Sequence, residues 1–356
     1  MKKDKENNLV KYDLGAFVEP LCLWYKENKR RMPWRDCGDA YRIWISEIML
    51  QQTRIEAVMG YYDRFLKRLP TVGDLAVVEE DELLKLWEGL GYYNRARNLQ
   101  KAAKEIVARY DSELPRDYEA LKKLPGIGNY TAGAIASMAY SISAPAVDGN
   151  VMRVTMRLLG CYDDIMKAGN RAEMERSLLQ VMPPDMPGEF NQAWMELGEV
   201  ICVPNGAPHC QQCPLATLCE AKQKGIQMEL PVKPVKKQRR IEKKTILLIE
   251  KGGMIGIQKR PDQGLLASMW ELPGLSGHKQ IKTLQKELQC EKIQSLGSAK
   301  HIFSHVEWHM KGHHVVVGEE DCVEIQKIFP SLIYVKKADL QQKYALPVAF
   351  HPFLQA

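Results

Sequence analysis

Residues 121–133, LKKLPGIGNYTAG, predict two short helices joined by a tight turn. Pro125 ends the first helix, and Gly126 and Gly128 allow the positive φ angles that a sharp turn needs. The second helix begins at about Asn129 with unpaired backbone N–H groups, which form an anion site without a charged side chain. Such a turn either binds a DNA phosphate or is an ordinary helical hairpin, and this segment by itself does not separate the two.

The rest of the first half has the apolar spacing of helices. Segments 41–65, 81–93 and 97–110 repeat apolar residues every three or four positions. No alternating strand pattern stands out between residues 12 and 220. We therefore predict an all-helical region over residues 1–220.

The composition changes after this helical region. Residues 221–242 hold three prolines or glycines amid a charge run, which predicts an interdomain linker. The run at 233–244 carries seven Lys/Arg and one Glu, which equals the whole net charge of +6. It is either a solvated linker or also a contact for nucleic-acid phosphate. Residues 243–356 contain strand-like runs, with a hairpin at Gly252-Gly253, and predict a small α+β domain.

The overall composition is that of a globular protein. Of the 356 residues, 45% are hydrophobic and 26% are charged, and the length allows two or three domains. No apolar run is long enough to span a bilayer, and the charged N-terminus lacks the core of a secretory signal. We therefore expect a cytoplasmic, DNA-associated protein that does not contact membranes and acts as a monomer.

The turn gains meaning from an aspartate some twenty residues later. Asp148 lies in the Pro/Gly-containing loop of SAPAVDGNVMRV, residues 143–154, directly before a predicted helix. An L-P-G-I-G turn followed at this distance by an Asp resembles the helix–hairpin–helix DNA glycosylase superfamily. The resemblance implies that Asp148 is essential for breaking the bond between base and sugar.

A second carboxylate lies in an apolar helix. In WISEIMLQQT, residues 44–53, Glu47 shares one helical stripe with Trp44 and Ile48. Desolvation on such a stripe raises a carboxyl pKa and suits a general acid, although an isolated Glu more often keeps its head in water. Cleavage of an N-glycosidic bond needs one protonated carboxyl for the leaving purine and one ionised carboxylate for the cationic sugar.

Three segments, SEIMLQQT, GLGYYNRARNL and AVDGNVMRV, resemble those of MutY-type adenine DNA glycosylases, and the similarity spans roughly residues 12–350. The resemblance implies hydrolytic removal of adenine mispaired with 8-oxoguanine or guanine in double-stranded DNA. The adenine must leave the base stack, because the bond is inaccessible inside it. The resemblance further implies that Glu47 protonates adenine and Asp148 stabilises the sugar cation.

Other site residues follow from the same resemblance. Tyr130 would hydrogen-bond near Glu47, and Asn150 would assist the site. The residues implied to contact DNA are the wedge residues Gln52 and Tyr92, and Pro125, Gly126 and Gly128 of the turn.

Four of the nine cysteines form a cluster with the spacing C-x7-C-x2-C-x5-C: Cys202, Cys210, Cys213 and Cys219. In a reducing compartment this density indicates a metal site, and four thiolates hold either zinc or an iron–sulfur cluster. The resemblance implies a [4Fe–4S] cluster. The family commonly has six residues in the first gap, and this chain has one more, in the turn at 204–206.

The segment LLASMWELPGL, residues 265–275, resembles the Nudix-like C-terminal domain of MutY proteins. The following LSGHKQIKTLQKELQC lacks the clustered glutamates that bind Mg²⁺ in a working Nudix hydrolase, so we expect no pyrophosphatase activity. Phe303, Ser304 and His305 match the loop by which the family reads 8-oxoguanine. Without the resemblance, these residues would be read as part of a strand.

The predicted fold is therefore an all-α helix–hairpin–helix glycosylase region with an iron–sulfur loop, followed by a smaller α+β Nudix-like domain. Within the first region, a six-helix module covers about 31–140, and a cluster module combines the N-terminal helix with about 141–220. Two alternatives remain open. One is a bifunctional glycosylase/lyase of the endonuclease III type, which carries a nucleophilic Lys where this chain has Tyr130. The other is a lesion-binding protein without catalysis.

Overall fold

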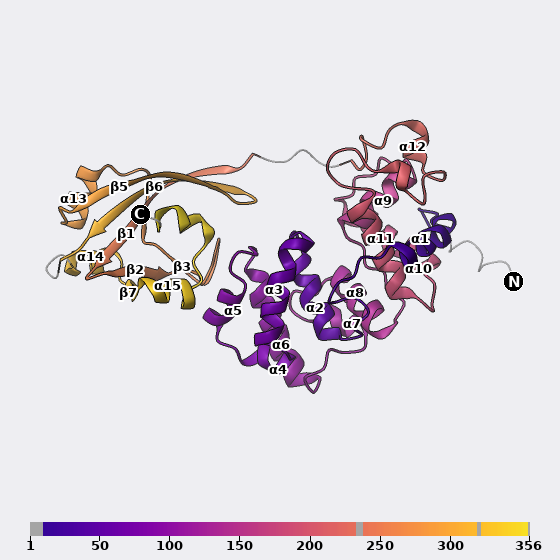
Figure 1. Cartoon of the computed structure of the whole chain (residues 1–356), viewed down its shortest axis with the longest axis horizontal. Coiled ribbons are helices and arrows are strands. Elements are labelled where there is room, and N and C mark those ends of the chain that lie inside the picture. The colour runs from indigo at the N-terminus through magenta and orange to yellow at the C-terminus, as the bar shows by residue number, and fades with distance from the viewer. Residues whose placement is uncertain (1–9, 233–237, 319–321, 355–356) are drawn as a thin grey trace. The chain divides into compact units, whose positions relative to one another are not determined.

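The computed structural model describes residues 10–232, 238–318 and 322–354 (Figure 1). The chain forms two compact units. We call Met1–Ala76 with Asn98–Val235 the helical unit, and Val77–Arg97 with Lys236–Ala356 the sheet unit. Residues 233–237 of the predicted basic linker lie outside the described residues. Within the described ranges, no helix combines the length and the apolar character that a membrane crossing requires.

The helical unit contains no strand in the residues that the structure describes, which confirms the predicted all-α region. The run predicted at 41–65 is two helices, because residues 51–54 form a turn between them. Helices α4 and α6 extend across the boundary between the units. The helices are α1 Gly15–Asn28, α2 Ala40–Leu50, α3 Ile55–Arg68, α4 Val72–Val77, α6 Asn94–Arg109, α7 Tyr118–Lys122, α8 Asn129–Tyr140, α9 Gly149–Leu158, α10 Ala168–Val181, α11 Pro187–Val200, the 3₁₀ helix η1 Cys210–Gln212 and α12 Glu220–Lys224.

Helices α2 and α8 pack against each other. Helix α2 starts at the N-cap Asp39, whose carboxylate accepts a hydrogen bond from the backbone N–H of Arg42 at 3.1 Å. Almost every residue of α2 from Tyr41 to Met49 is buried, so this is a core helix. Helix α8 is buried over residues 131–137, mostly with small side chains, which let neighbouring backbone approach closely.

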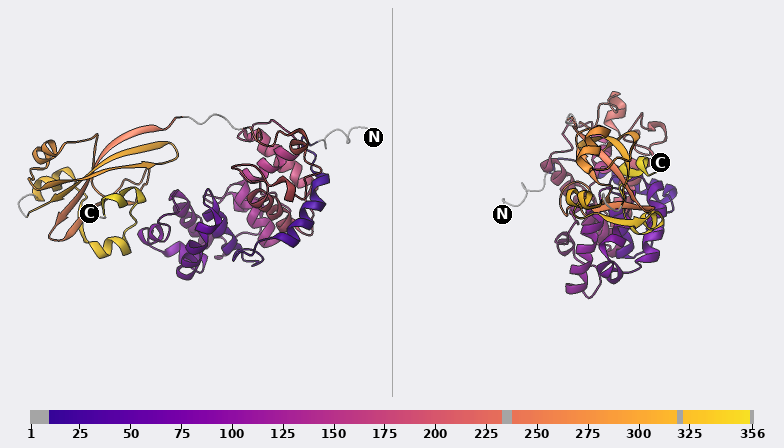
Figure 2. Two further views of the ribbon diagram at one scale, coloured as in Figure 1. Left: turned by 45° about the horizontal axis from the view of Figure 1, so that its top comes forward. Right: turned by 90° about the vertical axis from the view of Figure 1, so that its left-hand side faces the viewer.

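A second core joins the N-terminal helix to helices from much later in the chain (Figure 2). Leu21 and Tyr25 of α1 are buried with residues of α9, α10 and α11. Phe190 and Trp194 of α11 meet edge to face in this core, with ring centroids 6.1 Å apart. Burial of this apolar surface holds α9 against α11, which in turn packs on α8.

The sheet unit is built on a mixed sheet with the strand order β3-β2-β1-β6-β5. Strands β1 and β6 run parallel, and the other pairings are antiparallel, with β4 beside β1 and β7 beside β2. The elements are α5 Glu80–Leu86, β1 Arg240–Lys251, β2 Met254–Lys259, β3 Trp270–Glu271, β4 Gly274–Ser276, α13 Ile281–Leu288, β5 Ile293–Ile302, β6 Val306–Val316, α14 Cys322–Ile328, β7 Ile333–Lys336, α15 Lys337–Lys343 and the 3₁₀ helix η2 Val348–Phe353.

The predicted hairpin at Gly252-Gly253 is confirmed. It joins β1 to β2 with Lys251 opposite Met254, and both glycines have positive φ angles, +56° and +78°. Strand β1 is buried on both faces of the sheet. Ile246 and Leu248 contribute to one core, and Leu247 and Ile249 to the other, as the alternation of side chains along a strand requires. The α+β prediction for this part of the chain is therefore confirmed.

The structure differs from the sequence-based boundaries at two places. Residues 77–97, which the sequence groups with the helical region, belong to the sheet unit. There Lys259 pairs with Asp81 at 2.7 Å, and the backbone N–H of Leu346 donates to Glu88 at 2.7 Å. The predicted linker 221–242 is also shorter, because α12 extends to Lys224 and β1 begins at Arg240.

Candidate active site

A cavity of about 1020 Å³ opens in the helical unit, where α2, α8, α9 and α11 meet. Its lining includes Glu47, Tyr130, Asp148 and Asn150, the four residues that the sequence nominates for catalysis. They come from positions as far as 103 residues apart, from 47 to 150. The structure thus brings all four to one cavity.

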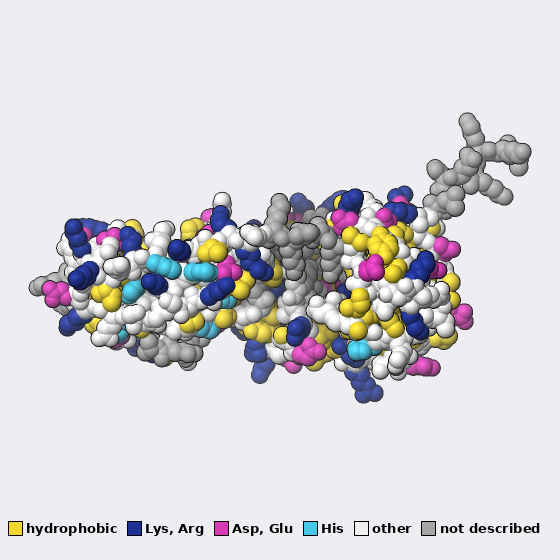
Figure 3. Space-filling model, turned by 90° about the horizontal axis from the view of Figure 1, so that it is seen from above, with side chains coloured by type: hydrophobic (Ala, Val, Ile, Leu, Met, Phe, Trp, Pro, Cys, Tyr) yellow, Lys and Arg dark blue, Asp and Glu magenta, His cyan; other side chains and the backbone are white. Residues whose placement is uncertain are grey.

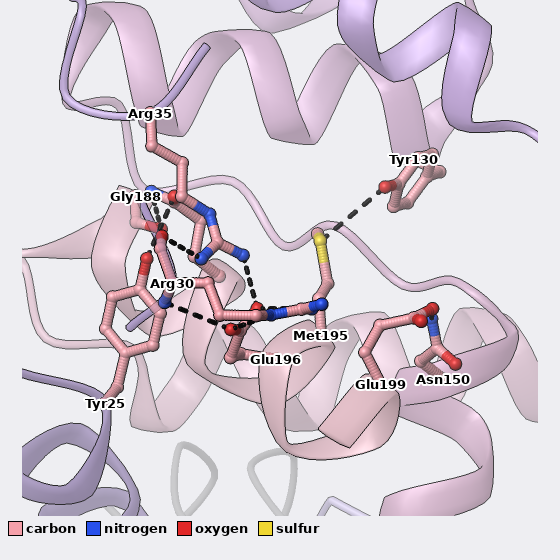
Figure 4. A network of polar contacts seen from close by, with 10 residues as sticks. Tyr25, Arg30, Arg35, Tyr130, Asn150, Gly188, Met195, Glu196 and Glu199 are labelled. Carbon is pink, nitrogen blue, oxygen red and sulfur yellow. Dashed lines mark hydrogen bonds and ion pairs between the residues drawn. The ribbon is translucent and has the colours of Figure 1, made fainter. Parts of the chain in front are cut away.

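Glu47 is almost fully buried in this cavity wall, with 5% of its surface exposed. The Tyr130 hydroxyl donates a hydrogen bond to Glu47 Oε2 at 2.6 Å. It also lies 3.6 Å from Met195 Sδ (Figure 4). Burial raises the pKa of Glu47 to about 7, the hydrogen bond from Tyr130 opposes the rise, and the nearby charge of Asp148 adds to it. A carboxyl with a pKa near neutrality can hold a proton and give it up.

Asp148 is the N-cap of α9 and accepts a hydrogen bond from the Val151 N–H at 2.8 Å. The side-chain amide of Asn150 donates to Asp148 Oδ2 at 2.9 Å. It also donates to Glu199 Oε1 at 3.0 Å (Figure 4). Arg153 in turn donates to the Asn150 side-chain oxygen at 2.8 Å. Loss of hydration raises the pKa of Asp148, and the backbone N–H groups of Val151 and Asn150 oppose that rise. These donors hold the carboxylate in one orientation.

Two residues that the sequence does not reveal place Asp148 beside Tyr130. A Cβ atom at Gly133 would lie 2.2 Å from the carbonyl oxygen of Pro145, so only glycine lets this loop lie against α8. The buried Asn191 of α11 accepts from the Ala146 N–H at 3.0 Å and donates to the Ala144 carbonyl at 2.9 Å. No local pattern in the sequence marks either position, because their partners are distant or are backbone atoms.

An ion network of Glu196 with Arg30 and Arg35 lies at the wall of the cavity (Figure 4). Glu196 is completely buried on α11 and pairs with Arg30 at 2.6 Å and with Arg35 at 2.5 Å. Arg35 and Glu196 both line the cavity, and the charge of Arg35 lowers the pKa of Glu47. No local sequence pattern reveals this network, because Glu196 lies more than 160 residues from each of its two arginine partners.

The glycine turn has the predicted positive φ angle at Gly126 but not at Gly128, whose φ of −93° lies in the extended region. Gly126 has φ +77°, and a Cβ there would lie 2.7 Å from Cβ of Asn98. Gly128 is the N-cap of α8 with no side-chain cap, and both glycines are exposed, while Pro125 is partly exposed. The first N–H groups of α8 therefore have no partner within the helix and no capping side chain. Such a terminus can bind a phosphate.

The two predicted wedge residues lie in different units. Gln52 is exposed at the turn after α2, has φ +60° and lines the cavity. Tyr92 belongs to the sheet unit, has φ +47° and is 48% exposed. Its hydroxyl lies 2.7 Å from the Ser304 hydroxyl, within hydrogen-bond distance. A positive φ is uncommon for residues other than glycine, and such positions cluster at functional sites.

Phe303, Ser304 and His305 form the tip of the hairpin between β5 and β6. Ser304 and His305 are exposed, whereas the Phe303 ring packs edge to face on the buried Trp308, with centroids 4.9 Å apart. The Arg239 side chain donates to the Phe303 carbonyl at 3.1 Å. In the space-filling view, histidine side chains lie among lysine and arginine side chains on the visible face of this unit (Figure 3). These three residues therefore form the loop of a hairpin and do not lie inside a strand.

The four clustered cysteines line one small cavity in the helical unit: Cys202, Cys210, Cys213 and Cys219. Arg157 Nη1 lies 3.3 Å from Cys202 Sγ, which places a fixed positive charge beside the thiols. In the described part of the chain, no three His, Cys, Asp or Glu side chains converge as the ligands of a single metal ion would. The four thiols surround a space and do not meet at one point.

Comparison with known proteins agrees with this architecture. Residues 45–184 match the family model of the HhH-GPD superfamily base excision DNA repair proteins, and residues 245–356 match that of the NUDIX domain. Among solved structures, a thermostable thymine-DNA glycosylase is similar with a TM-score of 0.54 and 30% identity, covering 59% of this chain and 96% of that one. A trapped endonuclease III–DNA covalent intermediate is similar with a TM-score of 0.52 and 28% identity, covering 59% and 97%.

Curated relatives match over most of the chain. The adenine DNA glycosylase of Mus musculus is 35% identical, over 83% of this chain and 69% of the mouse protein. The Schizosaccharomyces pombe enzyme is 30% identical, over 94% and 88%. The enzyme of Buchnera aphidicola from Schizaphis graminum is 33% identical, over 83% and 86%. The chain spans about two thirds of the length of the mouse and human relatives. This chain belongs to the adenine DNA glycosylase family of the HhH-GPD superfamily.

Proposed function

We propose that the protein flips adenine out of double-stranded DNA and removes it by hydrolysis when it is mispaired with 8-oxoguanine or guanine. The observation that carries the proposal is the meeting of Glu47, Tyr130 and Asp148 at one cavity of the helical unit. A cavity of about 1020 Å³ has room for a flipped base with part of its sugar.

In this proposal Glu47 is the general acid. Its pKa of about 7 keeps a large share of the carboxyl protonated near neutral pH. A proton delivered to a ring nitrogen of adenine makes the base a better leaving group, because the electrons of the breaking bond then end on a neutral purine. Tyr130 holds the carboxyl through its 2.6 Å hydrogen bond and fixes the direction of the transfer.

Asp148 is the proposed anionic partner. As the bond to adenine breaks, positive charge develops on the sugar, and a carboxylate held nearby stabilises that charge. The Val151 N–H and the Asn150 amide bind Asp148 at 2.8 and 2.9 Å and so favour its ionised form. The two carboxyls thus have different surroundings, as the two roles require.

Water is the proposed nucleophile. A lyase that cuts the strand through a Schiff base needs an amine at the site, and Tyr130 stands where endonuclease III-type enzymes carry a lysine. Neither Lys122 nor Lys123 lines the cavity. We therefore place the protein among the monofunctional enzymes, in which base removal leaves the DNA strand intact.

The proposed DNA contacts include groups from each of the two units. The uncapped start of α8 at Gly128 binds a backbone phosphate, and Gln52 enters the duplex beside the cavity. On the sheet unit, Tyr92 serves as a second wedge, and Ser304 and His305 supply hydrogen-bonding groups for the edge of 8-oxoguanine. The proximity of Tyr92 and Ser304 supports a shared role at one base.

The four clustered cysteines are the proposed ligands of a [4Fe–4S] cluster. Thiolates are the ligands that such clusters require, and these four surround a cavity next to the cationic Arg157. When bound, the cluster would tie the loop at 202–219 to α9 and stabilise the surface near the DNA.

Single-turnover adenine release tests the proposal. Duplexes that pair adenine with 8-oxoguanine, guanine or cytosine are incubated with excess protein, and free adenine is measured with and without borohydride. We expect the fastest release opposite 8-oxoguanine, slower release opposite guanine, and no strong covalent trapping. Strong trapping would support the lyase alternative, and tight binding of the mispair without release of adenine would support a non-catalytic lesion-binding protein.

A further inference from the structure

A further hollow, of about 440 Å³, lies in the sheet unit where α13 meets strands β5 and β6. Three lysines line it: Lys279 and Lys282 at the start of α13, and Lys311 on β6. None of the described residues that line it is acidic. Lys279 also pairs with Glu287 at 2.7 Å, whereas no carboxylate in the described chain forms an ion pair with Lys282 or Lys311. The hollow therefore has an excess of positive charge.

The floor of this hollow contains a buried histidine that leaves at least one ring nitrogen unpaired. His313 on β6 is 5% exposed, and neither ring nitrogen meets the geometry of a hydrogen bond with any described residue. The Lys279 carbonyl lies near enough to favour the charged ring, although burial lowers the pKa of His313. The Lys279 carbonyl can accept from only one ring nitrogen, and buried polar groups are nearly always satisfied, so the other nitrogen indicates a missing partner.

The backbone adds further donors and space. Helix α13 has the N-cap Gln280 without a side-chain cap, so its first N–H groups have no partner in the helix. A β-bulge interrupts the pairing of β5 with β6 between Ser295 and Gly297, and Gly297 has φ +84°. Ser295 lies directly across from His313, and Ser298 lines the same hollow. Lys311 and His313 lie on the same face of β6, because side chains alternate along a strand.

We propose that this hollow binds a phosphate group. Ammonium groups, serine hydroxyls, an imidazole and helix N–H groups are all donors, and a phosphate presents several strong acceptor oxygens in one place. The phosphate belongs either to a free nucleotide or to the DNA backbone. The site uses none of the residues at the cavity of Glu47 and Asp148, so it goes beyond the proposed adenine removal.

The test titrates pyrophosphate into the full-length protein at low salt and follows binding by calorimetry. We compare the wild type with the double variant K282Q/K311Q and with K286Q, which changes an exposed lysine of the same helix outside the hollow. We expect one bound pyrophosphate and about tenfold weaker binding for each lysine removed, as charged hydrogen bonds predict. K286Q should bind within about twofold of the wild type, the size of a screened surface effect.

A direct readout comes from the histidine side-chain NMR signals, with H313Q identifying that of His313. This signal should shift on addition of pyrophosphate, while that of the exposed His351 outside the hollow stays in place. No binding to the wild type, an equal loss in K286Q, or an unmoved His313 signal at saturation would overturn the proposal.

Competition identifies the source of the phosphate. Displacement of pyrophosphate by ADP but not by an undamaged duplex assigns the site to a free nucleotide. Displacement by the duplex, together with a smaller salt dependence of DNA binding in K282Q/K311Q, assigns it to the DNA backbone. Failure of both competitors would overturn the proposal, because the pyrophosphate would then occupy a different place.

Discussion

The Tyr130 hydroxyl donates a hydrogen bond to Glu47 Oε2 at 2.6 Å, between residues 83 positions apart in the chain. The bond joins the first residues of α8 to the buried core helix α2. Tyr130 therefore connects the turn proposed to bind DNA with the carboxyl proposed to protonate adenine. It also lowers the pKa of that carboxyl, because a hydrogen bond donated to a carboxylate favours the ionised form.

This relationship predicts the pH dependence of adenine release. Glu47 acts as an acid only while protonated, so the single-turnover rate should fall as pH rises through its pKa of about 7. Tyr130→Phe removes a hydrogen bond that lowers this pKa, so the falling limb should move to higher pH. Tyr140→Phe is the matched control, since that hydroxyl lies on the same helix and binds the Leu114 carbonyl. If the falling limb of the pH–rate profile of Tyr130→Phe stays in place or moves to lower pH, Glu47 is not the acid whose pKa sets it.

Asp148→Asn should separate binding from chemistry. Asparagine can still cap α9 by accepting from the Val151 N–H, so folding and mispair binding should persist. The lost negative charge should slow adenine release by about 10²-fold to 10³-fold, the usual effect of removing one electrostatic stabiliser. Asp185→Asn, the same change at an exposed position of the helical unit, should release adenine normally. Normal release by Asp148→Asn in single turnovers would remove Asp148 from its role.

Gly133→Ala should damage the site from within the core. The new methyl would lie 2.2 Å from the Pro145 carbonyl oxygen, so the loop that carries Asp148 must move away from α8. We expect a loss of about 1–3 kcal/mol in the free energy of unfolding, as overpacking costs, together with slower adenine release. In the control Gly169→Ala in α10, the added Cβ meets no atom within 4 Å, so this variant should keep both its stability and its rate of adenine release. Urea denaturation and single-turnover release measure the two effects, and an unchanged rate in folded Gly133→Ala would disprove the argument.

The cluster proposal predicts the metal content. Protein purified without oxygen should carry about four iron atoms per chain and the visible absorption of a [4Fe–4S] cluster. Cys210→Ser removes one proposed ligand and should lower both, whereas Cys37→Ser, outside the cysteine-lined cavity, should leave both unchanged. Stoichiometric zinc in place of iron in the wild type would reject the cluster.

The hairpin tip should control the choice of the opposite base. Ser304→Ala and His305→Ala each remove an exposed polar group at the turn between β5 and β6. Each should reduce the preference for 8-oxoguanine over guanine by about fivefold to tenfold, the usual value of one net hydrogen bond. His351→Ala changes an exposed histidine elsewhere in the sheet unit and should keep the preference. The measurement is the ratio of the adenine-release rates opposite 8-oxoguanine and opposite guanine. An unchanged ratio in both tip variants would show that the hairpin tip does not recognise the opposite base.

Local patterns were sufficient for much of the fold. Apolar spacing predicts the helices, the Gly252-Gly253 pair predicts the β1–β2 hairpin, and the run at 331–337 contains β7. The grouping of residues 77–97 with the sheet unit was not predictable, because it depends on contacts such as Lys259 with Asp81, 178 positions apart. Pairings at that distance leave no trace in the spacing of nearby residues.

The candidate site divides in the same way. The sequence nominated the side chains that we propose carry the chemistry: two carboxyls, a tyrosine in place of a lysine, a glycine turn and four cysteines. Tertiary structure alone decided that Glu47 is buried enough for a pKa near 7 and that Gly133 and Asn191 hold the Asp148 loop against α8. The physical reason is that residue types and spacings are local properties of a chain. Desolvation and close backbone approach depend instead on elements that only the folded core brings together.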